Sequence, residues 1–168
     1  SHIHKIKKIS LLLKNNRSNY LFVSAPENVA WLLNIRGFDN PNSPIPNCQL
    51  IITDKKKIFL ISELKKVKKL IKEKKIITKQ VIEPNNFESL IKKLDKGKII
   101  IDSKSCSIFN ENYIKKKLKI FKVEDPIYLL KSIKNKSEID HMINSHILDG
   151  VALTKFLYWI KKINKKKI

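Results

Sequence analysis

Glycine is scarce in this chain, and its scarcity excludes several common enzyme sites. The 168 residues include only three glycines, Gly37, Gly97 and Gly150. A phosphate-binding P-loop, a dinucleotide-binding fingerprint and the nucleophile elbow of serine hydrolases each need two or more closely spaced glycines. No two glycines here lie within fifty residues of each other. None of these three sites can therefore be present in the sequence.

Arginine is equally scarce, although the chain is strongly basic. Lys and Arg number 36 against 15 Asp and Glu, a formal net charge of +21, yet only Arg17 and Arg36 are arginines. Almost half of the chain consists of three residue types that A/T-rich codons encode: 34 lysines, 28 isoleucines and 15 asparagines. This bias favours a genomic origin of the charge, because a surface shaped for phosphates is expected to use the bidentate guanidinium. We expect salt-sensitive attraction to polyanions but no specific nucleic-acid partner.

Cysteine is limited to Cys48 and Cys106, which favours a reducing compartment without a disulfide framework. No segment has the composition of a signal peptide. The most apolar stretch, 147–160, is interrupted by Asp149 and Lys155, so we expect no membrane span. These features predict a cytoplasmic protein with no membrane partner.

The hydrophobic pattern alternates between strand-like and helix-like segments. Hydrophobic residues make up 42% of the chain, enough for a sizeable core. The pattern predicts strands at 20–23, 50–53, 58–61, 76–82, 98–102 and 119–123. Helices are predicted to follow Pro26 and Ser62, with Ser62 as a cap. Helices between most strands, together with one hairpin at 50–61, predict a layered α/β domain with a mixed, mostly parallel sheet.

A long C-terminal helix is predicted after residue 135. Asn135 and Glu138 have the spacing of a capping box, and apolar residues recur from Ile139 to Ile160. They spread nearly all round the helix, a pattern typical of burial on more than one side. We therefore expect the covering partner to lie outside this chain, and we expect a homo-oligomer when that partner is missing.

No combination of residues assembles an acid, a base and a nucleophile. His141 and His146 would lie about 140° apart around a helix, so they cannot share a metal ion. Cys48 has no histidine or cation next to it in the sequence that would activate a thiol. The sequence predicts neither catalytic residues nor metal ligands in this chain.

One local cluster surrounds Arg36. The segment 31–39, WLLNIRGFD, runs into a loop with three prolines between 41 and 46. An arginine in a lysine-rich chain suggests a geometric task for its planar guanidinium. Two interpretations remain open: a local Arg36–Asp39 pair, with Gly37 allowing a tight turn after the helix, or side chains that face a cleft. Arg36 and Asp39 are therefore the cleft-facing candidates.

Two segments of the chain carry a more specific pattern. The first is 26–39, PENVAWLLNIRGFD, and the second comprises 132–142 and 145–160. The first resembles the start of the middle, creatinase-N-like domain of Xaa-Pro aminopeptidases, the aminopeptidase P family of creatinase–prolidase type. The second resembles the linker and first helix of that family's catalytic domain. The departures from the family pattern are the lysine content and Ser145, where relatives typically have a small residue such as Ala.

This resemblance implies a cytosolic, three-domain parent metalloprotease of which the chain is a fragment. It implies a creatinase-N-like α/β domain at 1–132, and at 133–168 the linker and first helix of a pita-bread catalytic domain. In the family, that domain binds two divalent metal ions, usually manganese, through two Asp, one His and two Glu. It removes the N-terminal residue that precedes proline in a peptide. The fragment itself would hold no cofactor, would help to wall the active-site cleft and would be inactive alone. The alternatives are a stand-alone binding module and, less favoured, a basic nucleic-acid-binding protein.

Overall fold

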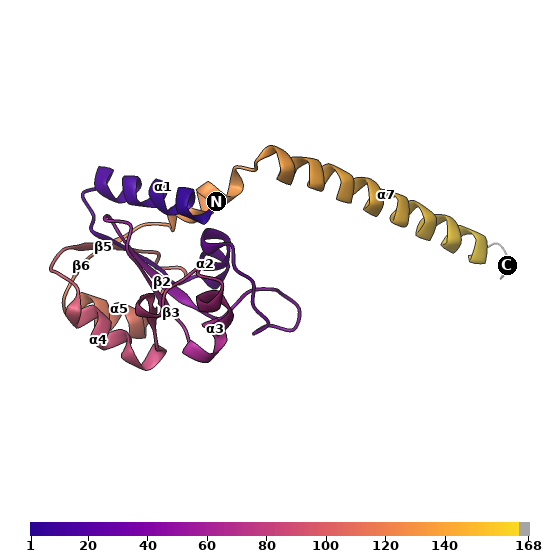
Figure 1. Cartoon of the computed structure of the whole chain (residues 1–168). Helices are drawn as coiled ribbons and strands as arrows, with labels where there is room; N and C mark the ends of the chain where they lie inside the picture. The colour runs from indigo at the N-terminus through magenta and orange to yellow at the C-terminus, as the bar shows by residue number, and fades with distance from the viewer. Residues whose placement is uncertain (165–168) are drawn as a thin grey trace. The chain divides into compact units, whose positions relative to one another are not determined.

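The computed structural model describes residues 1–164 and contains two compact units (Figure 1). The first unit is Ser1–Leu130, and the second begins at Lys131. Residues 165–168, the end of the predicted linker-and-helix segment 133–168, lie outside the described residues. The domain boundary after residue 132 stays a prediction.

A six-stranded sheet forms the centre of the first unit, with the strand order β4-β3-β2-β1-β5-β6. Its strands are β1 (Tyr20–Val23), β2 (Gln49–Thr53), β3 (Ile58–Ile61), β4 (Val81–Ile82), β5 (Lys98–Ile101) and β6 (Lys119–Lys122). The pairs β1–β5, β5–β6 and β3–β4 are parallel, whereas β1–β2 and β2–β3 are antiparallel. The predicted α/β fold with a mixed, mostly parallel sheet and a long C-terminal helix is confirmed.

Helices cover both faces of this sheet (Figure 1). One face packs against α1 (His2–Asn15), α2 (Pro26–Leu33), α3 (Leu64–Lys72) and α6 (Pro126–Ser132). The other face packs against α4 (Phe87–Lys93) and α5 (Ile108–Lys115). In β1, Leu21 and Val23 join the first core and Tyr20 and Phe22 join the second, because successive side chains of a strand point to opposite faces. Each fully buried Leu, Ile or Phe stabilises these layers by about 1.5–3 kcal/mol.

The predicted strand 76–82 is wrong over most of its length. Only Val81–Ile82 pairs with β3, because Thr78–Gln80 form a short 3-10 helix, η1. The Ile77 side chain is exposed, and its backbone N–H donates to Gln80 Oε1 at 3.0 Å. A local side chain thus satisfies a backbone donor that a longer strand would have paired with the sheet.

The start of α3 also differs from the prediction. Ser62 does not cap this helix, whose N-cap residue is Glu63. The backbone N–H of Leu64 donates instead to Glu83 Oε1 at 2.8 Å. A side chain 19 positions away therefore satisfies the helix end, and no local sequence pattern announces it.

A buried polar network at the carboxyl ends of β1 and β5 positions α2 and α6. The side chain of Asn28, which is fully buried, donates Nδ2 to Asp125 Oδ2 at 2.8 Å. Asp125 also accepts from the Ile127 N–H at 2.9 Å, and its own N–H donates to Asp102 Oδ2 at 3.1 Å. Both buried carboxylates therefore have hydrogen-bond donors, as burial of a charge requires. This network holds the start of α6, a helix that the hydrophobic pattern did not predict.

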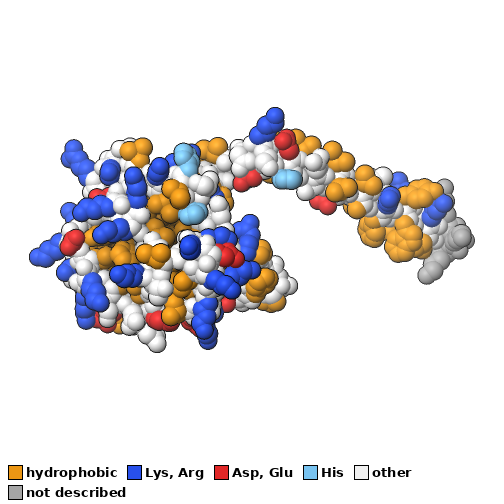
Figure 2. Space-filling view, viewed as in Figure 1, with side chains coloured by type: hydrophobic (Ala, Val, Ile, Leu, Met, Phe, Trp, Pro, Cys, Tyr) orange, Lys and Arg blue, Asp and Glu red, His pale blue; other side chains and the backbone are white. Residues whose placement is uncertain are grey.

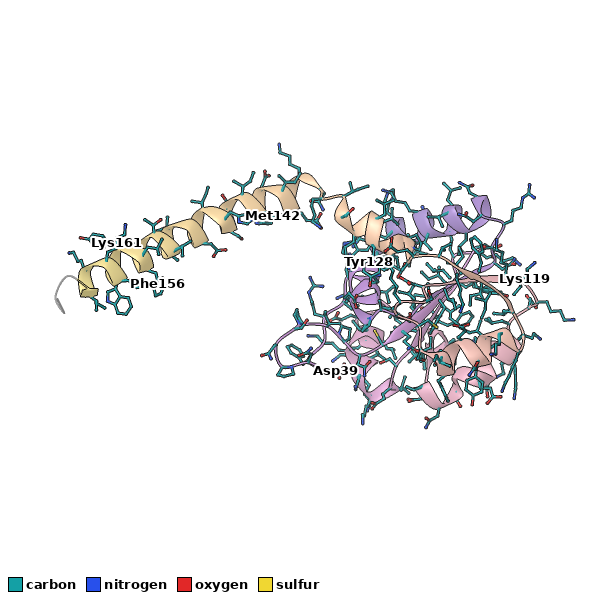
Figure 3. All side chains as sticks on the ribbon, turned by 180° about the vertical axis from the view of Figure 1, so that it is seen from behind. Asp39, Lys119, Tyr128, Met142, Phe156 and Lys161 are labelled. Atoms are coloured by element: carbon teal, nitrogen blue, oxygen red, sulfur yellow. The ribbon has the colours of Figure 1, made fainter. Side chains whose placement is uncertain are left out.

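The second unit is dominated by α7 (Lys136–Asn164), a helix of 29 residues. Its predicted capping box is confirmed: the Asn135 N–H donates to Glu138 Oε2 at 2.8 Å, and the Glu138 N–H to Asn135 Oδ1 at 3.0 Å. Apolar side chains project from α7, with Met142 47% and Phe156 52% exposed (Figures 2 and 3). Of the helices in residues 1–164, none combines the length and the apolar content that crossing a membrane requires.

Candidate functional site

The loop 34–48 connects α2 to β2 and carries the cluster singled out in the sequence, including Asp39 (Figure 3). Helix α2 ends at Leu33 because Asn34 adopts the left-handed conformation, with φ 54° and ψ 45°. Asparagine is one of the few residues other than glycine that visit this region routinely. After the turn, Ile35 is buried and Arg36 is exposed, so the loop begins with an anchored residue beside a solvent-accessible one.

Gly37 closes the loop by packing against Pro46. Its N–H donates to Pro44 O at 3.1 Å, and a Cβ placed at Gly37 would lie 2.6 Å from both Cα and Cβ of Pro46. The φ angle of Gly37 is not positive, so the prediction that this glycine allows the tight turn is wrong. Asn34 makes the turn, and Gly37 is needed because no side chain fits between the two segments.

Asp39 ties the loop to itself and to α3. Its Oδ1 accepts from Lys66 Nζ at 2.7 Å, and its Oδ2 accepts from the Asn47 N–H at 2.8 Å. The hydrogen bond from Lys66, followed by that from Asn47, lowers the pKa of the Asp39 carboxyl below its usual value. Arg36 Nη1 donates to Ile35 O at 3.3 Å. The ion-pair partner of Asp39 is thus Lys66, and not Arg36 as one of the two interpretations assumed.

Arg36 and Asp39 line the same cleft, which has a volume of about 330 Å³. Small-molecule sites typically enclose about 300–1,000 Å³. The floor is apolar and the rim charged, with the lining residues Ile35, Arg36, Gly37, Phe38, Asp39, Pro46, Cys48, Leu60, Ser62, Lys66, Val67, Lys69 and Leu70. Phe38 is 97% exposed, whereas Leu60 is fully buried. The structure brings the two sequence candidates together at a ligand-sized space, and their contact with a substrate stays a prediction.

Cys48 lies at the floor of this cleft and is not a nucleophile. Burial raises the pKa of its thiol to about 12, so the reactive thiolate is negligible near neutral pH. Burial likewise raises the pKa of Cys106 to about 11. Asp39 and Lys66 bind each other, so the described lining residues offer no base beside a nucleophile. The arrangement offers a ligand-sized space with an apolar floor and a charged rim.

Lys66 is a cleft residue that no sequence pattern predicted. Helix α3 reads LKKVKKLIK, and nothing in this pattern separates the lysine that contacts Asp39 from its neighbours. The approach of the loop 34–48 to α3 selects Lys66. This choice depends on tertiary structure alone.

Metal-ligating side chains do not gather in the described residues. No group of three or more His, Cys, Asp and Glu within residues 1–164 is arranged to hold a metal ion. His141 and His146 are exposed and lie about 140° apart around α7. The two Asp, one His and two Glu that the resemblance implies as metal ligands of the catalytic domain therefore cannot be assigned to residues 1–164.

Fold and cleft together define a three-layer α/β domain with a ligand-sized cleft on one side of its sheet. The chain belongs to the Creatinase/Prolidase N-terminal domain family, whose sequence profile matches residues 1–138. The resemblance of segment 26–39 to a creatinase-N-like domain is thereby confirmed, and the assignment of 132–142 and 145–160 to the linker and first helix of a catalytic domain stays a prediction.

Curated relatives of the chain include Xaa-Pro aminopeptidases. Xaa-Pro aminopeptidase 1 of Dictyostelium discoideum is 34% identical over 160 residues, which are 94% of this chain and 25% of the relative. Xaa-Pro aminopeptidase ApepP of Drosophila melanogaster is 32% identical over 160 residues, 91% of this chain and 26% of the relative. The chain thus spans about a quarter of the length of these relatives.

Solved structures agree with this assignment of the fold. The X-prolyl aminopeptidase of Caenorhabditis elegans, described as a cytosolic enzyme with a di-nuclear active site, superimposes with a TM-score of 0.74. The match covers 96% of this chain and 27% of that chain at 20% identity. At this level of identity the similarity establishes the creatinase/prolidase N-terminal fold.

Proposed function

We propose that this chain serves as a non-catalytic domain of a metal-dependent Xaa-Pro aminopeptidase, which removes the N-terminal residue preceding proline. One observation carries the proposal: the two relatives described above match more than nine-tenths of this chain and are Xaa-Pro aminopeptidases about four times its length. The substrate would be a peptide with proline at its second position. The chemistry, with two divalent cations and manganese as the proposed metal, would belong to a catalytic domain. The proposed location is the cytoplasm, as for the C. elegans enzyme.

Within such an enzyme, the cleft beside the loop 34–48 is proposed to face the active site. Asp39 holds the loop through Lys66 and the backbone of Asn47, so the loop has a defined shape. A rigid loop of this kind can wall a narrow entrance and position Arg36 toward a peptide. Its role would be to limit entry to short peptides rather than to take part in bond cleavage.

Helix α7 is proposed to be the first helix of the catalytic domain, with residues 133–168 as linker and helix. Support comes from its exposed apolar side chains, among them Met142, Val151, Phe156 and Trp159. An apolar surface of this extent is typical of a contact with another protein surface. Each large side chain would contribute about 1.5–3 kcal/mol when covered.

Without a catalytic domain to cover α7, we expect the chain to self-associate through this helix as a homo-oligomer. Sedimentation would compare the chain with a version ending at Lys134, which lacks α7. The longer chain should form a concentration-dependent oligomer, and the shorter one should stay monomeric. A strictly monomeric longer chain whose α7 amides resist hydrogen exchange would contradict this expectation.

The function itself is tested on an Xaa-Pro peptide. The purified chain with added Mn²⁺ should release no N-terminal residue, at the level of a mock preparation. The full polypeptide encoded by the same reading frame should release it, and a chelator should abolish the release. Turnover by the chain alone after repurification would contradict the proposal. A full polypeptide without the spaced Asp, Asp, His, Glu and Glu metal ligands would also contradict the proposal. That outcome would favour the alternative of a stand-alone binding module, which the cleft supports.

A further inference from the structure

We infer that the cleft between the loop 34–48 and α3 binds the carboxyl-terminal end of a short peptide: an apolar side chain in the cleft and a carboxylate at Arg36. The choice of a peptide rests on the proposed function. The chemistry of recognition, an apolar group next to an anion, rests on the cleft alone.

The floor of the cleft suits an apolar side chain. Ile35, Cys48, Leu60 and Val67 line it, and each is at most 5% exposed. These four side chains belong to the hydrophobic core, and the cleft of about 330 Å³ lies above them. A leucine-sized group entering it would remove from water mainly its own apolar surface and part of the exposed Phe38 side chain, which is favourable.

The charge of the rim selects an anion as the polar part of the ligand. The positive charge of Lys66 is compensated by two ion pairs, because its Nζ lies 2.7 Å from Asp39 Oδ1 and 3.5 Å from Glu63 Oε1. Arg36 and Lys69 form no ion pair within residues 1–164. The rim therefore carries uncompensated positive charge beside an apolar floor, which is complementary to a carboxylate on an apolar residue.

Arg36 is the group on this rim with the geometry to hold that carboxylate. Its backbone is held on both sides, by the buried Ile35 before it and by Gly37, which packs against Pro46, after it. Its Nη1 donates to Ile35 O, and the remaining N–H donors of the guanidinium match the two oxygens of a carboxylate. A lysine ammonium cannot make this bidentate pair. This requirement explains an arginine at position 36 in a chain that otherwise uses lysine for its positive charge.

The net charge of +21 attracts every anion, so the test needs an internal control. Arg17, the other arginine of the chain, provides it. Arg17 is exposed and precedes β1, whereas the cleft lies beyond the opposite end of β1, where Val23 pairs with Leu50. Arg36→Gln and Arg17→Gln therefore remove the same charge from the two ends of the sheet.

The experiment is an NMR titration of the whole chain with N-acetyl-Gly-Pro-Leu as the free acid and as its C-terminal amide. The free acid should bind about tenfold more tightly than the amide, as expected for loss of one charge-assisted pair. Shifts should concentrate on the loop 34–48 and α3. Arg36→Gln should abolish the preference for the acid, and Arg17→Gln should preserve it. Equal binding of acid and amide, or an equal loss in both variants, would overturn the inference.

A further probe separates a peptide end from a free carboxylate. The compound 4-methylpentanoate offers the same apolar group and carboxylate without peptide bonds, and it should bind more weakly than the peptide acid. Equal binding would overturn the assignment to peptides. Xaa-Pro cleavage by the full polypeptide is a separate measurement. If the full polypeptide cleaves but this cleft binds no peptide acid, the inference is wrong and the proposed function stands. If the cleft binds the peptide acid but the full polypeptide does not cleave, the proposed function is wrong and binding at the cleft stands.

Discussion

Alanine substitution of Gly37 should destabilise the first unit by a predictable amount. An alanine Cβ would lie 2.6 Å from Cα and Cβ and 2.9 Å from N of Pro46, and these are mostly backbone atoms that cannot rotate away. Overpacking of this kind costs about 1–3 kcal/mol. Alanine also lowers the conformational entropy of the unfolded chain relative to glycine, which offsets about 0.4–1 kcal/mol of that cost. We expect a net loss of about 1–2 kcal/mol, and a displaced loop 34–48.

The other two glycines provide matched controls with different expected outcomes. At Gly97 the nearest obstacle is the side chain of Asn19, whose Oδ1 accepts from the Lys98 N–H at 3.0 Å. Alanine there would displace that side chain and forfeit one hydrogen bond, about 1 kcal/mol. At Gly150 in α7 nothing lies within 4 Å of an added Cβ. Alanine there should stabilise the helix by about 1 kcal/mol.

Urea unfolding followed at core amides of the sheet measures the first two effects, and hydrogen exchange around position 150 measures the third. The midpoint should fall most for Gly37→Ala, less for Gly97→Ala and not at all for Gly150→Ala, which should slow exchange within α7. Unchanged or increased stability of Gly37→Ala would refute the argument, because it would mean that the loop does not need the close approach to Pro46.

Four further outcomes are expected. Asn28→Ala should lower the free energy of unfolding by about 2–3 kcal/mol, since it removes a donor from the buried carboxylate of Asp125; a change below 0.5 kcal/mol, about the size of an ordinary surface substitution, would contradict this. The Cys48 thiol, with its pKa raised to about 12, should resist alkylation at pH 8 until urea unfolds the chain, so rapid reaction of the folded protein would refute its burial. The pKa of Asp39 is lowered by Lys66, so its contribution to loop stability should be complete above the unfolded pKa and be lost as pH falls through the folded pKa; hydrogen exchange of the loop should show this acid dependence, and Asp39→Asn should remove it. Binding to random DNA should weaken steeply with salt, and a sequence-specific affinity at about 0.2 M salt would overturn the view that the charge is unspecific.

Several elements followed from the sequence because their causes are local. The runs YLFV at β1 and IFLI at β3 are short and apolar between polar turns, and both strands form where predicted. Asn135 and Glu138 cap α7 through two bonds between residues three positions apart. The segments 26–39, 132–142 and 145–160 predicted the family, which the sequence profile over residues 1–138 confirms. For these strands and for the cap of α7, the interactions that decide the structure lie within a few residues along the chain.

The cleft and the buried network depend on contacts between distant parts of the chain. Lys66 binds Asp39, which lies 27 positions away in the sequence, and Asn28 donates to Asp125, which lies 97 positions away. Neither pair is visible in the sequence, because any of several lysines or asparagines has the same chemistry. Gly37 is a third example. The sequence suggested a glycine that allows a tight turn after the helix, but the φ angle of Gly37 is not positive. Only the contact with Pro46 shows that this position needs a residue without a side chain. The family, the layered α/β fold and the apolar C-terminal helix could be predicted from the residues alone. The packing of the loop 34–48 against α3 pairs Lys66 with Asp39 and leaves Arg36 and Lys69 without an ion pair at the cleft within residues 1–164.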